Sequence, residues 1–390
     1  MTAAAGAGAL DAETFDTPQA LEPLLPEWDA LADAAGRPAS LPAWQLAWWQ
    51  TLAPAGAHLR VVAVRDGAGA LAGLFPFLFE PRRGRGSYAL LGASMTHRTE
   101  PLVRPDVAAA AAAAAAIAEL TRVGPAPDVV RLDGIVAEGP WLPAFAAAGP
   151  GAAPPWRLTE RQQLAPYVDL GHADFDAWLA SKSSNFRQQT RRFRRRLAKQ
   201  GGVVRMSEAH ELADDLDAML RLHRRRWDGR GGSSLPAATD AMVRLAAERL
   251  LTGERLRLWV VELEGRIVGA QLFLAAGGQV LYWNGGFDED AGHLKPAILG
   301  IVAGIEDSLA RGERVLDLGG GAQDYKLRLA DGATPLTWTT LVARNRRYAV
   351  NRLALAPRAL RLTARGVAHR LPEPVQDRLR AATRRYARSS

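Results

Sequence analysis

The chain has 390 residues, of which 48% are hydrophobic and 23% are charged, so it is long enough for two folded cores and unlike a disordered chain. It contains no Cys, which excludes disulfides, thiolate nucleophiles and sulfur-based zinc sites, and its 7 His show no metal-ligand spacing. The net charge of +8 comes from the C-terminal end, since residues 344–390 hold 13 Arg and 2 acidic residues while residues 1–343 hold 36 basic and 39 acidic ones.

A strand, turn, strand pattern appears twice along the chain. The first copy runs from Leu59 to Leu78 around Asp66-Gly67, and the second from Leu256 to Leu274 around Glu264-Gly265. Each is followed by a stretch typical of a helix and then by a short β-rich strand: residues 107–123 and 129–133 in the first case, 296–311 and 314–318 in the second. We therefore expect two related α/β halves, in preference to one continuous sheet.

Between the two copies, the Gly- and Pro-rich residues 149–155 are typical of a connection. A strand is predicted over 165–170, and an arginine-rich helix follows residues 183–185, which are good N-cap types. A further helix is predicted over 207–227, with acids early and arginines late. The arginine run 182–199 is explained equally well by a solvated helix face and by an anion site.

These patterns predict an α/β (α+β) protein with mixed sheets in three parts. Residues 1–155 form the first half, residues 156–343 form the second half, and residues 344–390 form an arginine-rich tail. The tail reads as short basic amphipathic helices broken at Pro357 and Pro372. No apolar run reaches the ~18 residues of a membrane span, and Met1–Leu10 lacks a basic leader, so we expect a cytoplasmic protein.

The run from Arg314 to Gly321 looks like the first strand and glycine loop of a methyltransferase. That fold needs several further strand and helix units after the loop, and too little chain remains for them. We interpret the glycines as a turn that leads into Asp324-Tyr325-Lys326.

Residues 169–342 resemble the GNAT-like acetyltransferase domain of proteins associated with cellulose and exopolysaccharide biosynthesis (CelD-like) and, more distantly, the FemAB peptidyltransferases. The resemblance is carried in order by these pieces: Ser184-Asn185-Phe186-Arg187, Leu222 to Trp227, Val261 to Gly269, Tyr282 to Asp288, Asp317-Leu318-Gly319 and Tyr325-Lys326. It implies tandem GNAT-like halves, with residues 156–343 as the acyltransferase domain and residues 1–155 as a degenerate half, which lacks counterparts to the arginine helix and the Tyr-Lys element. It also implies that Lys326 lies near the transferred carbonyl, where its ammonium offsets oxyanion charge, and that Tyr325 acts as an acid or orients the acceptor.

The donor implied by the resemblance is acetyl-CoA or another acyl-CoA, used as a co-substrate with no metal. Its phosphates would suit a helix N-terminus, and the best placed one starts near Lys295, Ala297 and Ile298. The usual GNAT pyrophosphate loop is not found in this half, so a Fem-like aminoacyl-tRNA donor stays open as an alternative. A third alternative is a non-catalytic protein that binds nucleic acid or membranes.

Five residues are candidates for binding the substrate. Arg187 and Arg226 could grip a phosphate or carboxylate, while aromatic stacking and an amide could come from Trp227, Trp283 and Asn284. His223 is the weak candidate for a general base. We expect an acyltransferase, most simply an N-acetyltransferase, that modifies an amino or hydroxyl group of a carbohydrate or cell-envelope precursor.

The tail suggests a location for this activity. Arginines near anionic lipid gain about 1 kcal/mol each, so residues 344–390 could hold the enzyme at the inner face of the membrane. Transfer RNA is expected as a partner only under the Fem-like alternative.

Overall fold

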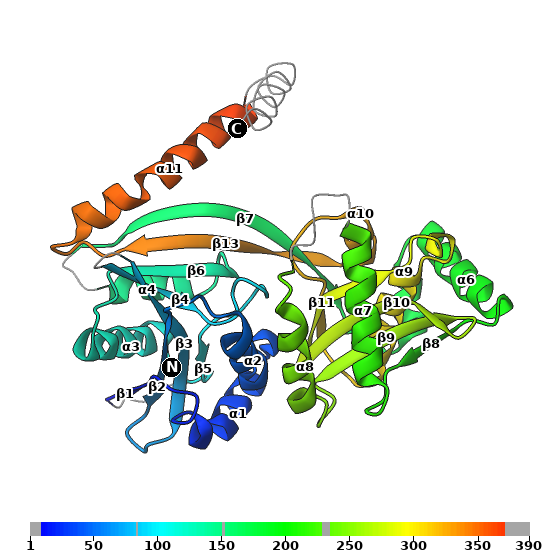
Figure 1. The fold of residues 1–390 in the computed structure, drawn as a ribbon, viewed down its shortest axis with the longest axis horizontal. Coiled ribbons are helices and arrows are strands. Elements are labelled where there is room, and N and C mark those ends of the chain that lie inside the picture. The colour runs from blue at the N-terminus through cyan, green and yellow to red at the C-terminus, as the bar shows by residue number, and fades with distance from the viewer. Residues whose placement is uncertain (1–8, 83–84, 150–152, 228–234, 371–390) are drawn as a thin grey trace, which may run out of the picture.

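The structure is a computed structural model that describes residues 9–82, 85–149, 153–227 and 235–370 (Figure 1). Its mixed sheet has 13 strands. The first seven are β1 (Asp11–Phe15), β2 (His58–Arg65), β3 (Leu71–Arg82), β4 (Arg85–Leu90), β5 (Leu102–Val103), β6 (Val129–Val136) and β7 (Trp156–Asp169). The others are β8 (Val203–Met206), β9 (Leu256–Leu263), β10 (Arg266–Ala276), β11 (Gln279–Phe287), β12 (Val315–Asp317) and β13 (Gly332–Val342).

The helices cover both faces of this sheet. Those of the first half are α1 (Leu25–Ala35), α2 (Pro42–Leu52), α3 (Ala109–Val123) and α4 (Trp141–Ala148). Those that follow are α5 (Phe175–Ser181), α6 (Ser184–Lys199), α7 (Leu212–Trp227), α8 (Thr239–Leu250), α9 (Pro296–Ala310), α10 (Asp324–Leu329) and α11 (Tyr348–Arg370). Short 3₁₀ turns lie at Glu22–Leu24, Pro38–Ser40 and Gly292–Leu294.

The two halves repeat one plan, as the sequence predicted. In the first half β1 is followed by α1, α2 and the antiparallel strands β2, β3 and β4, and in the second half β8 is followed by α7, α8 and β9, β10 and β11. A helix then leads to a strand parallel to the last one, by α3 to β6 and by α9 to β12. The repeat is therefore a pair of whole α/β units with a GNAT-like fold.

The last strand of each unit crosses to the other unit. β7 follows the first unit in sequence but pairs with β12 of the second, while β13 follows the second and pairs with β6 of the first. β7 and β13 also pair with each other, and so the strand order is β1-β2-β3-β4-β6-β13-β7-β12-β11-β10-β9-β8, with β5 beside β3. The expectation of separate sheets is wrong, because this exchange joins both units into one continuous sheet.

Among the described residues, one hydrophobic core lies between the units, two lie on the outer faces, and a smaller fourth one lies under α6 around Phe193 and Leu197. The shared core joins α1 and α2 to α7 and α8, with Trp44 and Trp283 in edge contact at 5.1 Å between ring centroids. On the outer faces, α3 and α4 cover the first unit, and α5 and α9 cover the second. Burial of so much apolar surface across the junction fixes the two units relative to each other.

The tail differs from its prediction. Its described part is one helix, α11, which continues through Pro357 even though proline removes one backbone hydrogen bond. Contacts on both sides of the proline hold the helix against the body, as Arg352 lies over Trp156 and Arg358 pairs with Glu160. Pro372 and the rest of the tail lie outside the described residues, as do three residues of the expected connection over 149–155.

Candidate functional site

The second unit opens along the edge of β11. β11 and β12 pair only where Gln279–Leu281 meet Val315–Asp317, and β12 ends there while β11 continues to Phe287. The register between β10 and β11 also shifts at Leu272 and Phe273, so that Trp283 is an extra residue on β11. A bulge and an unpaired strand edge leave room for a ligand beside the sheet.

A pocket of about 210 Å³ occupies this region. Its walls come from the end of α7, from β10 and β11, from the start of α9 and from α10. The lining residues are Arg226, Gln271, Tyr282, Gly285, Phe287, Gly292, Lys295, Pro296, Ala297, Ile298, Ile301 and Tyr325. Five predicted site residues, separated by up to 99 positions in sequence, therefore meet in one place: Arg226, Lys295, Ala297, Ile298 and Tyr325.

Two cations of this pocket have no carboxylate partner among the described residues. The neighbours of Arg226 are both paired, Arg224 with Asp240 and Arg225 with Asp290, whereas the Arg226 guanidinium lies over the Phe287 ring at 4.6 Å. Lys295 is exposed and adopts a left-handed backbone conformation, with φ of 56°, just before α9. Both cations are available to an anionic ligand.

The start of α9 adds two unused backbone donors. Pro296 occupies the first helical position and has no N–H, and no backbone acceptor faces the amides of Ala297 and Ile298. No side chain caps the helix. A 15-residue helix with free N-terminal amides favours negative charge, and the adjacent cations of Lys295 and Arg226 strengthen that preference.

Tyrosine hydroxyls lie at the inner end of the pocket. Tyr282 donates a hydrogen bond to Gln271 Oε1 at 2.7 Å, and Gln271 Nε2 donates to the Gly286 carbonyl at 3.3 Å. Burial raises the pKa of Tyr325, although Arg226 opposes the shift, and burial also raises the pKa of Tyr282. Both phenols therefore stay protonated at neutral pH. Gln271 was not predicted, because no sequence motif singles it out.

Lys326 is placed differently from its neighbour Tyr325. Its buried Nζ donates to the carbonyls of Gly319 and Gly320 at 3.2 and 3.0 Å, in the turn that precedes α10. Burial lowers its pKa to about 8, while nearby Asp317 acts in the opposite direction. Lys326 thus fastens the glycine turn to α10, the helix that carries Tyr325.

The first unit also holds this turn, through residues that sequence reasoning missed. Arg98 donates to Asp317 at 2.7 Å, and Asp317 accepts a hydrogen bond from the Gly319 amide. His97 lies against Gly320 and against the Trp338 ring, and burial lowers its pKa to about 4. No motif surrounds either residue, because their role depends on a contact between units.

The remaining predicted site residues do not line the pocket. Arg187 donates to the carbonyls of Ala180 and Lys182, where it caps α5. Trp283 donates to the Met95 carbonyl at 3.1 Å inside the shared core. Trp227 is 37% exposed beside Arg226, and Asn284 accepts from the Gly285 amide.

His223 does not line the pocket. Its Nδ1 lies 3.1 Å from the Gly285 carbonyl, the residue is 5% exposed, and burial lowers its pKa.

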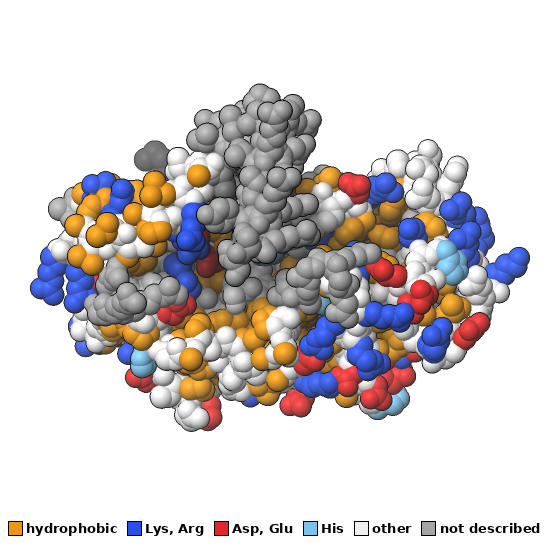
Figure 2. Space-filling view, turned by 45° about the horizontal axis from the view of Figure 1, so that its top comes forward, with side chains coloured by type: hydrophobic (Ala, Val, Ile, Leu, Met, Phe, Trp, Pro, Cys, Tyr) orange, Lys and Arg blue, Asp and Glu red, His pale blue; other side chains and the backbone are white. Residues whose placement is uncertain are grey.

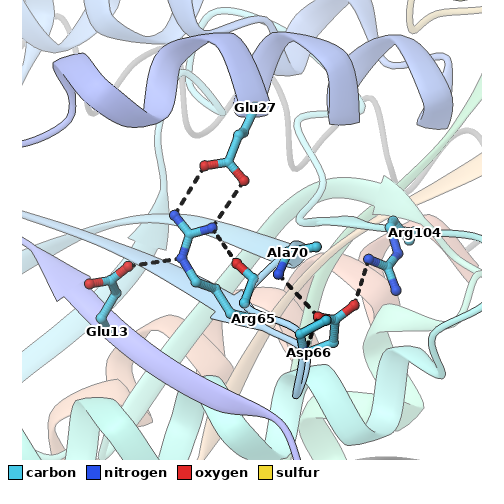
Figure 3. A network of polar contacts seen from close by, with 8 residues as sticks. Glu13, Glu27, Arg65, Asp66, Ala70 and Arg104 are labelled. Carbon is cyan, nitrogen blue, oxygen red and sulfur yellow. Dashed lines mark hydrogen bonds and ion pairs between the residues drawn. The ribbon is translucent and has the colours of Figure 1, made fainter.

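Among its described residues, the first unit holds no unpaired cation at the place that corresponds to Lys295. Arg104, which precedes α3 much as Lys295 precedes α9, pairs with Asp66 and Asp106, and Figure 3 shows the neighbouring Arg65 held by Glu13 and Glu27. The helix in the place of α10 is α4, which begins with the buried Trp141. The first unit therefore differs from the second in the charge of this region and in the helix that precedes its last strand.

Three comparisons place this geometry among known proteins. Residues 184–327 match the family model described as an acetyltransferase (GNAT) domain, and these residues include every lining residue of the pocket. No curated protein sequence matches the chain.

Among the described residues, no group of three His, Cys, Asp or Glu side chains could hold a metal ion.

The fold is similar to that of solved structures at low sequence identity. FemX aligns with a TM-score of 0.57 and 12% identity, over 84% of this chain and 96% of that one. The C-terminal domain (DUF2156) of a protein described as a lysylphosphatidylglycerol synthetase from Agrobacterium fabrum aligns with a TM-score of 0.51 and 12% identity, over 85% and 94%. A conserved protein of unknown function from Bacteroides thetaiotaomicron VPI-5482 aligns at 0.50 and 10%, over 84% and 99%. These likenesses establish the fold alone.

No helix within the described ranges is both long and apolar enough to cross a membrane.

Proposed function

We propose that the chain is an acyltransferase, in the first instance an N-acetyltransferase, that uses acyl-CoA. The acceptor would be an amino or hydroxyl group of a carbohydrate or cell-envelope precursor, the type suggested by the CelD-like resemblance. One observation supports the proposal above the others: inside the matched residues, Arg226 and Lys295 line the same pocket as the free amides at the start of α9. The phosphates of acyl-CoA suit this arrangement.

The pocket residues have separate parts in the proposed reaction. Acyl-CoA, when bound, supplies an acyl group activated as a thioester. Lys295 and the amides of Ala297 and Ile298 bind phosphate oxygens, and Arg226 closes the opposite wall. Tyr325 holds a proton on its hydroxyl at neutral pH and is the candidate general acid. Lys326 is a positioning residue in this proposal, because it fastens the glycine turn to α10, the helix that carries Tyr325.

A second candidate function is the Fem-like transfer from aminoacyl-tRNA. It is favoured by α6, whose Arg196 donates to the His293 carbonyl close to the start of α9. Arg191 and Arg195 on the same helix are exposed, and Figure 2 shows basic side chains gathered at the α6 end of the molecule. Such a surface could contact the phosphates of a tRNA.

Thermal melting with CoA, acetyl-CoA and longer acyl-CoAs tests the proposal. A ligand at 100 times its Kd should stabilise the protein by about 2.7 kcal/mol. We expect an upward shift for the wild type that is lost in Lys295→Ala and in Arg226→Ala. The matched controls are Lys199→Ala at the exposed end of α6 and Arg225→Ala, whose side chain pairs with Asp290 outside the pocket.

Three other outcomes would contradict the proposed site or the proposed function. A shift that survives both pocket variants would show that CoA binds at another place. No shift with any CoA, together with tRNA binding that weakens steeply with salt, would replace the proposal with the Fem-like function. Absence of both CoA binding and tRNA binding would favour the third alternative, a non-catalytic protein.

A further inference from the structure

α11 is fixed to the body along one side. Asn351 is 2% exposed, the Arg352 guanidinium lies 3.8 Å from the centroid of the Trp156 ring, and Arg358 pairs with Glu160. Figure 1 shows the helix rising from the end of β7 and β13 along an outer edge of the molecule. Because these contacts come from several turns of the helix, they determine which face of α11 points away from the protein.

The outward face of α11 is apolar. Leu353 is 75% exposed and Leu360 is 69% exposed, and with the exposed Pro357 they follow the spacing i, i+4, i+7 that places residues on one stripe of a helix. Val350, one turn before Leu353, is 55% exposed. Leaving leucine side chains in water forgoes about 2 kcal/mol each, so the stripe is suited to an apolar surface.

The arginines around this helix fall into two groups. Arg347, Arg352 and Arg358 are engaged with the body, through Asp128, Trp156 and Glu160. Arg346 and Arg361 are exposed and form no ion pair with any described residue. Arg361 follows Pro357 by four residues in the helical repeat, which places it beside the leucine stripe, whereas Arg346 lies in the turn just before α11. Seven more arginines and only two acids follow Arg361 in the sequence.

Other exposed apolar residues lie on elements of the same edge. Leu164 of β7 is 47% exposed and Leu327 of α10 is 51% exposed, and β7 packs against both α10 and α11. Trp227 ends α7 next to Arg226, which lines the same pocket as Tyr325 of α10. In Figure 1, α11, β7, α10 and one end of α7 lie along the upper side of the view.

We propose that this edge docks on an anionic lipid bilayer, with α11 lying in the plane of the interface. Leu353 and Leu360 enter the acyl boundary, and Arg346, Arg361 and the following arginines contact the headgroups. An apolar stripe flanked by arginines is the composition of an interfacial helix. RNA would use the arginines but would gain nothing from the leucines, so the combination favours lipid. This inference does not depend on the identity of the acyl donor.

Vesicle binding tests the contribution of the arginines and that of the leucine stripe separately. Full-length protein is sedimented with phosphatidylcholine vesicles with and without phosphatidylglycerol. The wild type should bind only the anionic vesicles. Arg346→Gln/Arg361→Gln should bind about thirty-fold more weakly, from about 1 kcal/mol per arginine, and Leu353→Gln/Leu360→Gln at least tenfold more weakly.

The matched controls remove exposed residues of the same types away from this edge. Val203→Gln on β8 and Arg249→Gln/Arg266→Gln should bind like the wild type. Because all the substituted residues are exposed, the variants should keep the wild-type melting temperature. Binding that falls with the arginine variant but not with the leucine variant, together with tight RNA binding, would overturn the proposal in favour of RNA.

The absence of Cys from the chain allows a second test that does not depend on affinity. Leu353→Cys and Val203→Cys each provide a unique attachment site for an environment-sensitive fluorophore. Anionic vesicles should shift the emission of the label at position 353 to the blue and leave the label at position 203 unchanged. Equal behaviour of the two labels, or no shift at position 353, would contradict insertion of α11.

Discussion

Tyr325 and Lys326 are adjacent in the chain, yet their side chains serve different places. Tyr325 lines the pocket, while Lys326 donates to two carbonyls of the glycine turn. Burial disfavours the charged form of each group, which raises the pKa of the phenol and lowers the pKa of the ammonium to about 8. Burial therefore widens the pH range over which the Tyr325 phenol and the Lys326 amine are uncharged.

The lowered pKa of Lys326 predicts a pH-dependent stability. Between about pH 8 and the usual lysine pKa of 10.5, the unfolded chain binds a proton that the folded one does not, so the free energy of unfolding should rise with pH. The rise should be about 3 kcal/mol, since the pKa falls from 10.5 to about 8 and each pKa unit corresponds to about 1.36 kcal/mol. Urea denaturation at a series of pH values above and below 8 measures it.

Lys326→Met should lose this rise, whereas Lys199→Met, at the exposed end of α6, should keep it. An identical slope in wild type and Lys326→Met would show that Lys326 does not titrate in this window.

At the scale of elements, glycines set how closely helices approach the sheet at the pocket. A Cβ at Gly286 would lie 2.4 Å from the His223 amide nitrogen and 2.7 Å from the Met219 carbonyl oxygen, both in the backbone of α7. On the other face, a Cβ at Gly269 would lie 2.7 Å from Pro296 at the start of α9. The position of Arg226 thus depends on a strand residue far away in sequence.

Gly286→Ala should push α7 away from β11, because helix backbone cannot give way as a flexible side chain can. We expect a loss of about 1 to 3 kcal/mol in the free energy of unfolding, measured by urea denaturation, and a smaller thermal shift with acyl-CoA. Gly67→Ala is the control, since nothing lies within 4 Å of its Cβ. Unchanged stability in Gly286→Ala would mean that the contact is looser than described.

At the scale of the whole molecule, the strand exchange joins the two units. Residues 1–155 alone would lack β13 as the partner of β6, and residues 156–343 alone would expose the shared core around Trp283. An unpaired strand edge and an uncovered apolar face both disfavour an isolated unit. The ion pair of Arg98 with Asp317 adds a charged contact across the same junction.

We therefore expect the two fragments to fold only together. Expressed singly, each should lack a cooperative thermal transition and near-ultraviolet circular dichroism, whereas co-expression should give a complex that can be purified. The full chain should unfold in a single transition. A cooperative transition in residues 156–343 alone, at the wild-type temperature, would show that the first unit is dispensable for the fold.

Features set by neighbouring residues could be predicted from the sequence. The hairpins β2–β3 and β9–β10, the basic helix α6 and the glycine turn before α10 depend on periodicity, propensity and turn chemistry over a few residues. The same local signals placed Lys295 before a helix and Tyr325 after a turn. The charge of the tail was also plain from the sequence, because charge is a sum over residues.

Only the tertiary structure decided what depends on long-range pairing and on the direction of side chains. Strand exchange between β7 and β13, the approach of Arg226 to Lys295 and the contact of His97 with Gly320 join residues far apart in the chain. Arg187 caps α5 because its side chain points to that helix end, and α11 continues through Pro357 because the body holds both sides. Local sequence determines which elements form, whereas packing between distant elements selects the residues that meet in the pocket.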